Sequence, residues 1–195
     1  MPRLKAVLLL SLATLCAPAF GQGANPAVPG TLNYVEGQVS MEGEALSQRS
    51  VGQASLEPGQ ILSTGAGKAE MLLTPGIFLR LDGNSEVRMI SPSLTNTVVA
   101  LDRGRAEIEV DELHKQNRIV VDQKGGQTQL LKGGLYEFNA NANTMRVFDG
   151  KAAVVEGSTQ AGAPLAGKVV EVKGDRELEL TGEATRPTSF NKSEA

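Results

Sequence analysis

The sequence predicts an all-β fold, either a twisted antiparallel β-sandwich or a solenoid-like stack of short strands. Short apolar or alternating runs recur between turn residues, whereas long apolar stripes with a helical period are hard to find. Glycine is frequent, at 22 of 195 residues, and tryptophan is absent. Asp-Gly pairs separate apolar runs at Asp82-Gly83 and Asp149-Gly150. Such pairs are the strongest short-range signal for a β-hairpin.

The predicted strands follow one another from residue 34 onward. Their ranges are 34–40, 60–62, 69–73, 78–81, 85–90, 97–101, 106–110, 119–121, 128–131, 135–138, 145–148, 152–155, 169–172 and 177–180. Residues 106–110 (AEIEV) alternate cleanly, which directs both glutamates toward water. Gly37 inside the first strand predicts a bulge or a close approach of two backbones.

Turns are expected wherever glycine or proline interrupts these runs. The predicted turns lie at Pro58-Gly59, Thr64-Gly65, Gly67 and Pro75-Gly76. A positive φ is expected at one or more of Gly65, Gly67 and Gly150. Residues 111–117 (DELHKQN) are polar apart from Leu113, so they predict a loop or a single turn and not a stable helix.

The N-terminal residues 1–21 have the pattern of a cleaved export signal. Arg3 and Lys5 precede an apolar run over 6–15, and Ala19-Phe20-Gly21 offers small residues before a cut. The apolar run is too short for a permanent membrane span, and Pro18 disfavours the alternative of a buried N-terminal helix. A lipidated cysteine needs a small residue directly before it, but Leu15 precedes Cys16. Simple cleavage near Gly21 is therefore favoured over lipidation.

The rest of the chain divides into five predicted segments. These are a linker (22–31), the main β domain (32–156), a flexible linker (157–167), a C-terminal β-hairpin around Lys173-Gly174-Asp175 (168–181) and a disordered tail (182–195). The small residues of the second linker suggest that the hairpin is an appendage. Removal of residues 157–195 is therefore expected to leave the main domain folded.

Composition limits the partners of the mature chain. Cleavage removes Cys16, the only cysteine, so disulfides and thiolate metal sites are excluded. It also removes Arg3 and Lys5, which takes the formal net charge from −3 to −5. A mildly acidic surface argues against nucleic acid and anionic lipid. We expect a cell-envelope protein as partner, no integral membrane span after cleavage, and self-association as a further possibility.

No catalytic, cofactor-binding or metal-binding residues are predicted. His114 is the only histidine, and its charged neighbours indicate a solvated loop position. Thr64–Lys68 departs from a phosphate-binding loop because Ala69 follows the lysine. Tyr34 and Tyr136 are the two candidate contact tyrosines, although a core or strand-edge position is favoured for each. Two phenylalanines in apolar strands, Phe138 and Phe148, are expected in the core.

Residues 56–81 (LEPGQILSTGAGKAEMLLTPGIFLRL) resemble the centre of the FecR-type extracytoplasmic domain. There an L-x-x-G-D-x-L-x-T-G-x-G-x-A pattern runs into D-G-S-x-L-x-L. The resemblance covers about residues 32–155 and is carried mainly by Gly37-Gln38-Val39, Leu56, Gly59, Leu62, Thr64-Gly65, Gly67, Ala69, Leu79-Arg80-Leu81, 101–106, 118–121, 134–138 and 147–150. It implies an extracytoplasmic β domain. The family's best-known members regulate sigma factors from the membrane. That role needs a cytoplasmic segment, and cleavage of the export signal would leave no part of this chain in the cytoplasm.

The sequence thus predicts an exported, periplasmic or secreted binding or assembly module of the bacterial cell envelope that is not an enzyme and needs no cofactor. Two alternatives stay open. One is an extracytoplasmic signal-sensing component of a regulatory pathway. The other is an envelope enzyme accessory that acts on cell-wall glycan. Glycines and strand positions specify a fold better than a function.

Overall fold

The computed structural model describes residues 28–157, 167–181 and 185–192. The predicted export signal, Cys16 and parts of both linkers and of the tail lie outside these residues. The described residues form one 3₁₀ turn, η1 (Gln48–Ser50), and the strands β1 (Leu32–Met41), β2 (Glu44–Ala45), β3 (Ile61–Thr74), β4 (Ile77–Leu81), β5 (Glu86–Ser93), β6 (Asn96–Arg103), β7 (Arg105–Val110), β8 (Arg118–Gln123), β9 (Gly126–Leu130), β10 (Gly134–Asn139), β11 (Thr144–Val147), β12 (Lys151–Glu156), β13 (Val169–Lys173), β14 (Arg176–Glu179) and β15 (Thr188–Ser189). The all-β prediction is confirmed. Within the same residues, no helix is long and apolar enough to cross a bilayer.

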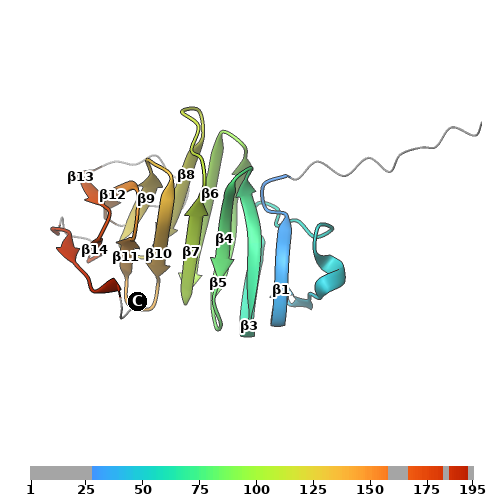
Figure 1. Ribbon diagram of the computed structural model, residues 1–195. Coiled ribbons are helices and arrows are strands. Elements are labelled where there is room, and N and C mark those ends of the chain that lie inside the picture. Colours follow the sequence, from blue (N-terminus) through green and yellow to red (C-terminus); the bar gives the residue numbers. More distant parts are fainter. Residues whose placement is uncertain (1–27, 158–166, 182–184, 193–195) are drawn as a thin grey trace, which may run out of the picture.

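The strands form one sheet that folds back on itself into two layers (Figure 1). The front layer has the order β4–β7–β10–β11–β14–β15, and the back layer has the order β5–β6–β8–β9–β12–β13. Neighbouring strands run antiparallel except for the parallel pair β6–β8. Strand β3 joins the layers, because residues 61–63 pair with β5 and residues 69–74 pair with β4. The arrangement matches the predicted sandwich better than the predicted solenoid.

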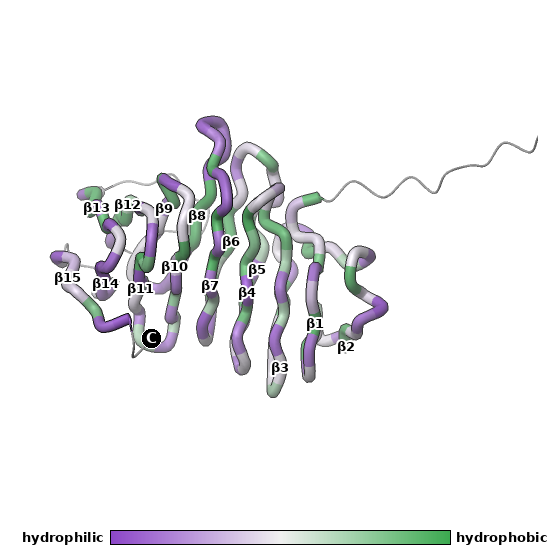
Figure 2. The backbone as a smooth tube through the Cα atoms, in the orientation of Figure 1, coloured by the Kyte–Doolittle hydropathy of each residue, from purple (hydrophilic) through white to green (hydrophobic). Residues whose placement is uncertain are grey.

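The core lies between the layers, and alternate residues supply it along strands such as β7. Hydrophobic and hydrophilic positions alternate along β7 (Figure 2). Leu79 and Ile108 of the front layer and Val99 and Val121 of the back layer are at most 1% exposed. Burying each of these aliphatic side chains contributes about 1.5–3 kcal/mol. The alternation in the sequence therefore identifies the inward face of the front layer. In the back layer, residues 97–101 of β6 and 119–121 of β8 are buried without alternation.

Tyr136 connects the two layers through its hydroxyl group. Its ring is fully buried on β10, and the hydroxyl donates to the Lys132 carbonyl (2.6 Å) and accepts from the Lys151 amide (3.0 Å) at the start of β12. Burial raises the pKa of this hydroxyl, and its hydrogen bonds to the backbone oppose the rise. Phe138, two residues on, is also fully buried. Both residues therefore belong to the core.

The backbones of β1 and β3 approach very closely where Gly37 faces Gly67. A Cβ atom on Gly67 would lie 2.4 Å from the Glu36 carbonyl oxygen, and one on Gly37 would lie 2.3 Å from the Ala66 carbonyl oxygen. Gly37 has a φ of +67°, and the register shifts between Gly37 and Val39, which confirms the predicted bulge. Only residues without a Cβ fit here.

Two turns predicted around this point are wrong. Thr64-Gly65 and Gly67 lie inside β3, and neither Gly65 nor Gly67 has a positive φ. Gly67 is required by the neighbouring β1 backbone, whereas a Cβ atom on Gly65 would meet the Gln38 side chain at 2.8 Å. The sequence pattern does not distinguish such close contacts from a chain reversal. Pro75-Gly76 does form a hairpin turn, between β3 and β4, and Gly150 has the predicted positive φ, at +101°.

Three predicted hairpins are layer crossings instead. Asp82-Gly83 joins β4 to β5, Asp149-Gly150 joins β11 to β12, and Lys173–Asp175 joins β13 to β14, yet none of these pairs of strands shares a ladder. In each case one strand lies in the front layer and the other in the back layer. Two strands that face the same core have the same alternation whether they lie side by side or across from each other. The turn is therefore predictable, and the pairing is not.

The C-terminal strands belong to the main domain and are not an appendage. Strand β13 extends the back layer beside β12, and β14 extends the front layer beside β11. Val172, Leu178 and Leu180 are at most 2% exposed and close one end of the core. Removal of residues 157–195 would therefore expose apolar core, so the main domain is no longer expected to stay folded without them.

Described parts of the predicted tail and of the first linker are also ordered against the sheet. Strand β15 pairs with β14, and the ring of Phe190 meets Phe148 edge-on at 5.0 Å between centroids. At the other end of the chain, the Gly30 amide donates to the Leu72 carbonyl (2.7 Å). By contrast, residues 111–117 form the predicted loop, with one turn in which the Asn117 amide donates to the His114 carbonyl (2.9 Å).

The close approach of β1 and β3 predicts an unequal pair of glycine variants. Gly67→Ala places a methyl group against the β1 backbone, so we expect it to lower the free energy of unfolding by about 3 kcal/mol. Gly43→Ala is the control, because Gly43 has a φ of +83° and open space around the Cβ position. Its expected cost is about 1 kcal/mol of backbone strain. Urea unfolding measures both, and equal losses would contradict the close contact.

Candidate binding face

The outer face of the front layer carries one row of aligned side chains that crosses eight strands. Each member lies directly opposite the next in the strand register, so all project from the same side of the sheet. We call this the charged row, and its members are Tyr34, Glu70, Arg80, Glu107, Glu137, Arg146, Glu177 and Thr188. They come from β1, β3, β4, β7, β10, β11, β14 and β15 in that order.

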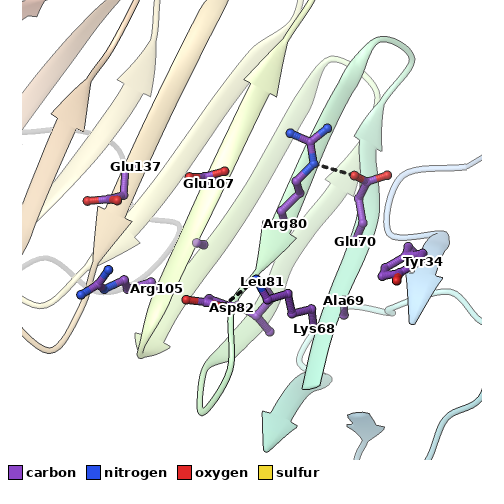
Figure 3. Close-up of a pocket in the computed structure, with 11 residues that line it drawn as sticks. Tyr34, Lys68, Ala69, Glu70, Arg80, Leu81, Asp82, Arg105, Glu107 and Glu137 are labelled. Carbon is purple, nitrogen blue, oxygen red and sulfur yellow. Dashed lines mark hydrogen bonds and ion pairs between the residues drawn. The ribbon is translucent and has the colours of Figure 1, made fainter. Parts of the chain in front are cut away.

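A hollow of about 410 Å³ lies over part of this row, from β1 to β10. Figure 3 shows its lining, in which Glu137, Glu107, Arg80, Glu70 and Tyr34 follow one another across the strands. A second line of charged side chains borders the hollow and consists of Lys68, Asp82 and Arg105. The hollow thus combines polar walls with an aromatic ring at one end.

Two arginines neutralise most of the row. Arg80 Nε donates to Glu70 Oε2 at 2.8 Å, and its Nη2 lies 2.5 Å from Glu109 Oε2. The hydrogen bond to Glu70 raises the pKa of Arg80, and Glu109 adds to this rise against the effect of partial burial. Arg146 acts similarly further along the row, where it contacts Glu137 (3.2 Å) and Glu177.

Glu107 remains without a cation. It lies directly opposite Glu137 on one side and Arg80 on the other, but Arg80 directs its guanidinium to Glu70 and Glu109. Within the described part of the chain Glu107 forms no ion pair. Its like-charged neighbour Glu137 has a side chain only 8% exposed. Like charges directly opposite each other destabilise a sheet, so we expect Glu107 to oppose folding even though Arg146 contacts Glu137.

The residues singled out from the sequence lie in different places. His114 has a side chain that is 57% exposed, with Nδ1 3.6 Å from Glu112, as expected for a solvated loop. Tyr34 is 44% exposed at the end of the charged row, and its hydroxyl donates to Glu36 at 2.8 Å, which raises the pKa of Tyr34. Phe148 is partly buried against Phe190. Among the described residues, no three metal-binding side chains come together.

The charged row itself was not predicted. Its signal was present, since Glu107 and Glu109 alternate with apolar residues in AEIEV. However, Glu107 and Glu137 are 30 positions apart, and only the register of β7 with β10 places them opposite each other. Alternation indicates which way a side chain points but not what lies beside it on the next strand.

Comparison with known proteins gives a coarse structural similarity. No protein-family model matches the sequence, and no curated protein matches it significantly. Two crystal structures of a candidate anti-sigma factor from Parabacteroides distasonis ATCC 8503 are similar, each with 13% identity and a TM-score of 0.49. The match covers 66% of this chain and 59% of the crystallised protein. The role of this chain must therefore be argued from its own residues.

The unbalanced carboxylates predict a variant that increases stability. Glu107→Gln removes one of two opposed charges, so we expect the free energy of unfolding to rise by about 0.5 kcal/mol at low salt. Glu70→Gln is the matched control in the same row, because it deprives Arg80 of a partner and should lower stability by about 0.5 kcal/mol. Urea unfolding at pH 7 compares the two. A loss of stability in Glu107→Gln would show that this carboxylate is compensated after all.

Proposed function

We propose that this chain is an exported, non-catalytic binding module of the bacterial cell envelope, and that the charged row with its hollow is the face that meets a protein partner. The observation that carries the proposal is the uncompensated Glu107 within an otherwise paired row. A folded protein retains an unfavourable charge pair most readily where a partner supplies the missing charge. Charge complementarity of this kind sets partner choice and association rate.

Two features of the sequence support the envelope location. Residues 1–21 have the pattern of a cleaved export signal, and residues 32–155 resemble the FecR-type extracytoplasmic domain. The sheet edge at β1 offers few free backbone groups to a partner. There, the outward carbonyl of Leu32 accepts from Gly52, and Leu46 donates to Val39, so the 44–55 segment covers much of the free side of β1. Covered edges resist strand addition, so this edge is disfavoured as a contact surface, whereas β13 at the end of the back layer pairs with β12 on one side only.

The same resemblance favours a second role, that of a signal-sensing component of an extracytoplasmic regulatory pathway. In that role the charged row would contact the component that delivers the signal. The accessory acting on cell-wall glycan is less favoured. Carbohydrate platforms use several exposed aromatic faces, and only Tyr34 lines the hollow with an aromatic ring.

Site-specific photo-crosslinking in intact envelopes of the source bacterium tests the proposal. A photoreactive residue in place of Glu107 is expected to give a discrete adduct with one protein. The control places it at Asp102 of β6, which is also exposed but belongs to the back layer. The mass of the recovered chain should correspond to a start near Gln22. Equal adducts from both positions, or none from position 107, would contradict the proposed face.

A further inference from the structure

We infer that the charged row recognises a basic side chain, a lysine or arginine in an extended segment of the partner protein, with its cation held between Glu107 and Glu137. This inference rests on the proposed function and specifies the chemistry of the partner at the same face. The carboxylates of both glutamates accept hydrogen bonds only, so the group between them must be a donor.

The charge of the row supports a cationic guest. It contains four glutamates and two arginines, which leaves it at −2. The excess is local, because the other three glutamates of the row, Glu70, Glu137 and Glu177, each contact an arginine while Glu107 contacts none. A guest cation would therefore complete the alternation of charge at the one position where the chain itself leaves it incomplete.

The geometry sets the reach of the guest. Directly opposed residues on neighbouring strands have Cβ atoms about 5 Å apart, so an ammonium or guanidinium group can contact both carboxylates. Arginine suits this position best, because its planar fork binds carboxylates in pairs. The contact between the cation and Glu137 would be shielded from water, since the Glu137 side chain is 8% exposed, and an ion pair is stronger where water is excluded. The hollow of about 410 Å³ above the row leaves room for the incoming side chain.

Tyr34 supplies a second contact at the opposite end of the hollow. It is three strands away from Glu107, along β1, β3, β4 and β7. Strands lie about 4.8 Å apart, which makes this span about 14 Å, the length of about four extended residues. A partner segment that crosses the strands would therefore place its basic residue about four positions from the residue that packs on the Tyr34 ring.

Other guests fit this face less well. An acidic peptide or a phosphate group would be attracted to Lys68 and Arg105, but Lys68 already lies 3.5 Å from Asp82, and the row beside them is acidic. A divalent cation would find only two adjacent carboxylates, and no group of three forms within the described residues. An anionic membrane surface would be repelled by the same carboxylates.

Titration of the full mature chain with defined peptides, followed by two-dimensional NMR, tests the inference. The probes are an eight-residue peptide of alternating lysine and threonine and its counterpart with glutamate in place of lysine. The lysine peptide should perturb amides of β7 and β10, and the glutamate peptide should not. Glu107→Gln should weaken binding about fivefold, as expected for one exposed ion pair.

Asp102→Asn is the control on the back layer. It removes one negative charge, together with the Arg88–Asp102 ion pair (2.6 Å), far from the charged row and should change the affinity less than twofold. Equal weakening in both variants would show nonspecific attraction and overturn the inference, as would equal binding of both peptides. The outcome is separable from that of the proposed function. Crosslinking at position 107 together with no binding of the lysine peptide would overturn only the basic guest, whereas an absence of crosslinking would overturn the face itself.

Discussion

The contact between Gly37 and Gly67 is the constraint on which the fold depends most. It lies where β3 passes from its pairing with β5 (residues 61–63) to its pairing with β4 (residues 69–74), and it lets β1 follow β3 through both regions. The two layers therefore share a strand, and the sheet is continuous from β13 to β15. At the opposite end, Leu178 and Leu180 close the core between β11 and β12. The charged row crosses eight strands because this sheet is continuous from β1 and β3 to β15.

The sequence predicted local structure well because alternation and turn residues are local properties. The strand 106–110 was found from AEIEV, and the turn at Asp149-Gly150 has the expected positive φ at Gly150. The pairing of strands was harder to predict. Asp82-Gly83 and Asp149-Gly150 reverse the chain between layers, and nothing in the flanking residues separates this from a hairpin. Gly67 was assigned to a turn because a close backbone contact leaves no periodic signal, and Gly65 was assigned with it.

The charged row was missed for a related reason, since it depends on register over long separations in sequence. Each glutamate by itself is an ordinary outward residue of an alternating strand. The row becomes informative when Arg80 is seen to bind Glu70 and Glu109 while Glu107 faces Glu137. Stability alone would favour a neutral side chain at one of these positions. A site that opposes folding slightly and offers an unfilled place for a cation is consistent with selection for binding.

The coupling between Glu107 and Glu137 is the quantity that tests this account most directly. A double-mutant cycle measures it from the unfolding free energies of the native chain, Glu107→Gln, Glu137→Gln and the double variant at low salt. The account predicts that the two carboxylates repel each other by about 0.5 kcal/mol, and that the coupling falls in 1 M salt. A coupling of zero, or an attractive one, would mean that the row is balanced and would remove the physical basis for a cationic partner.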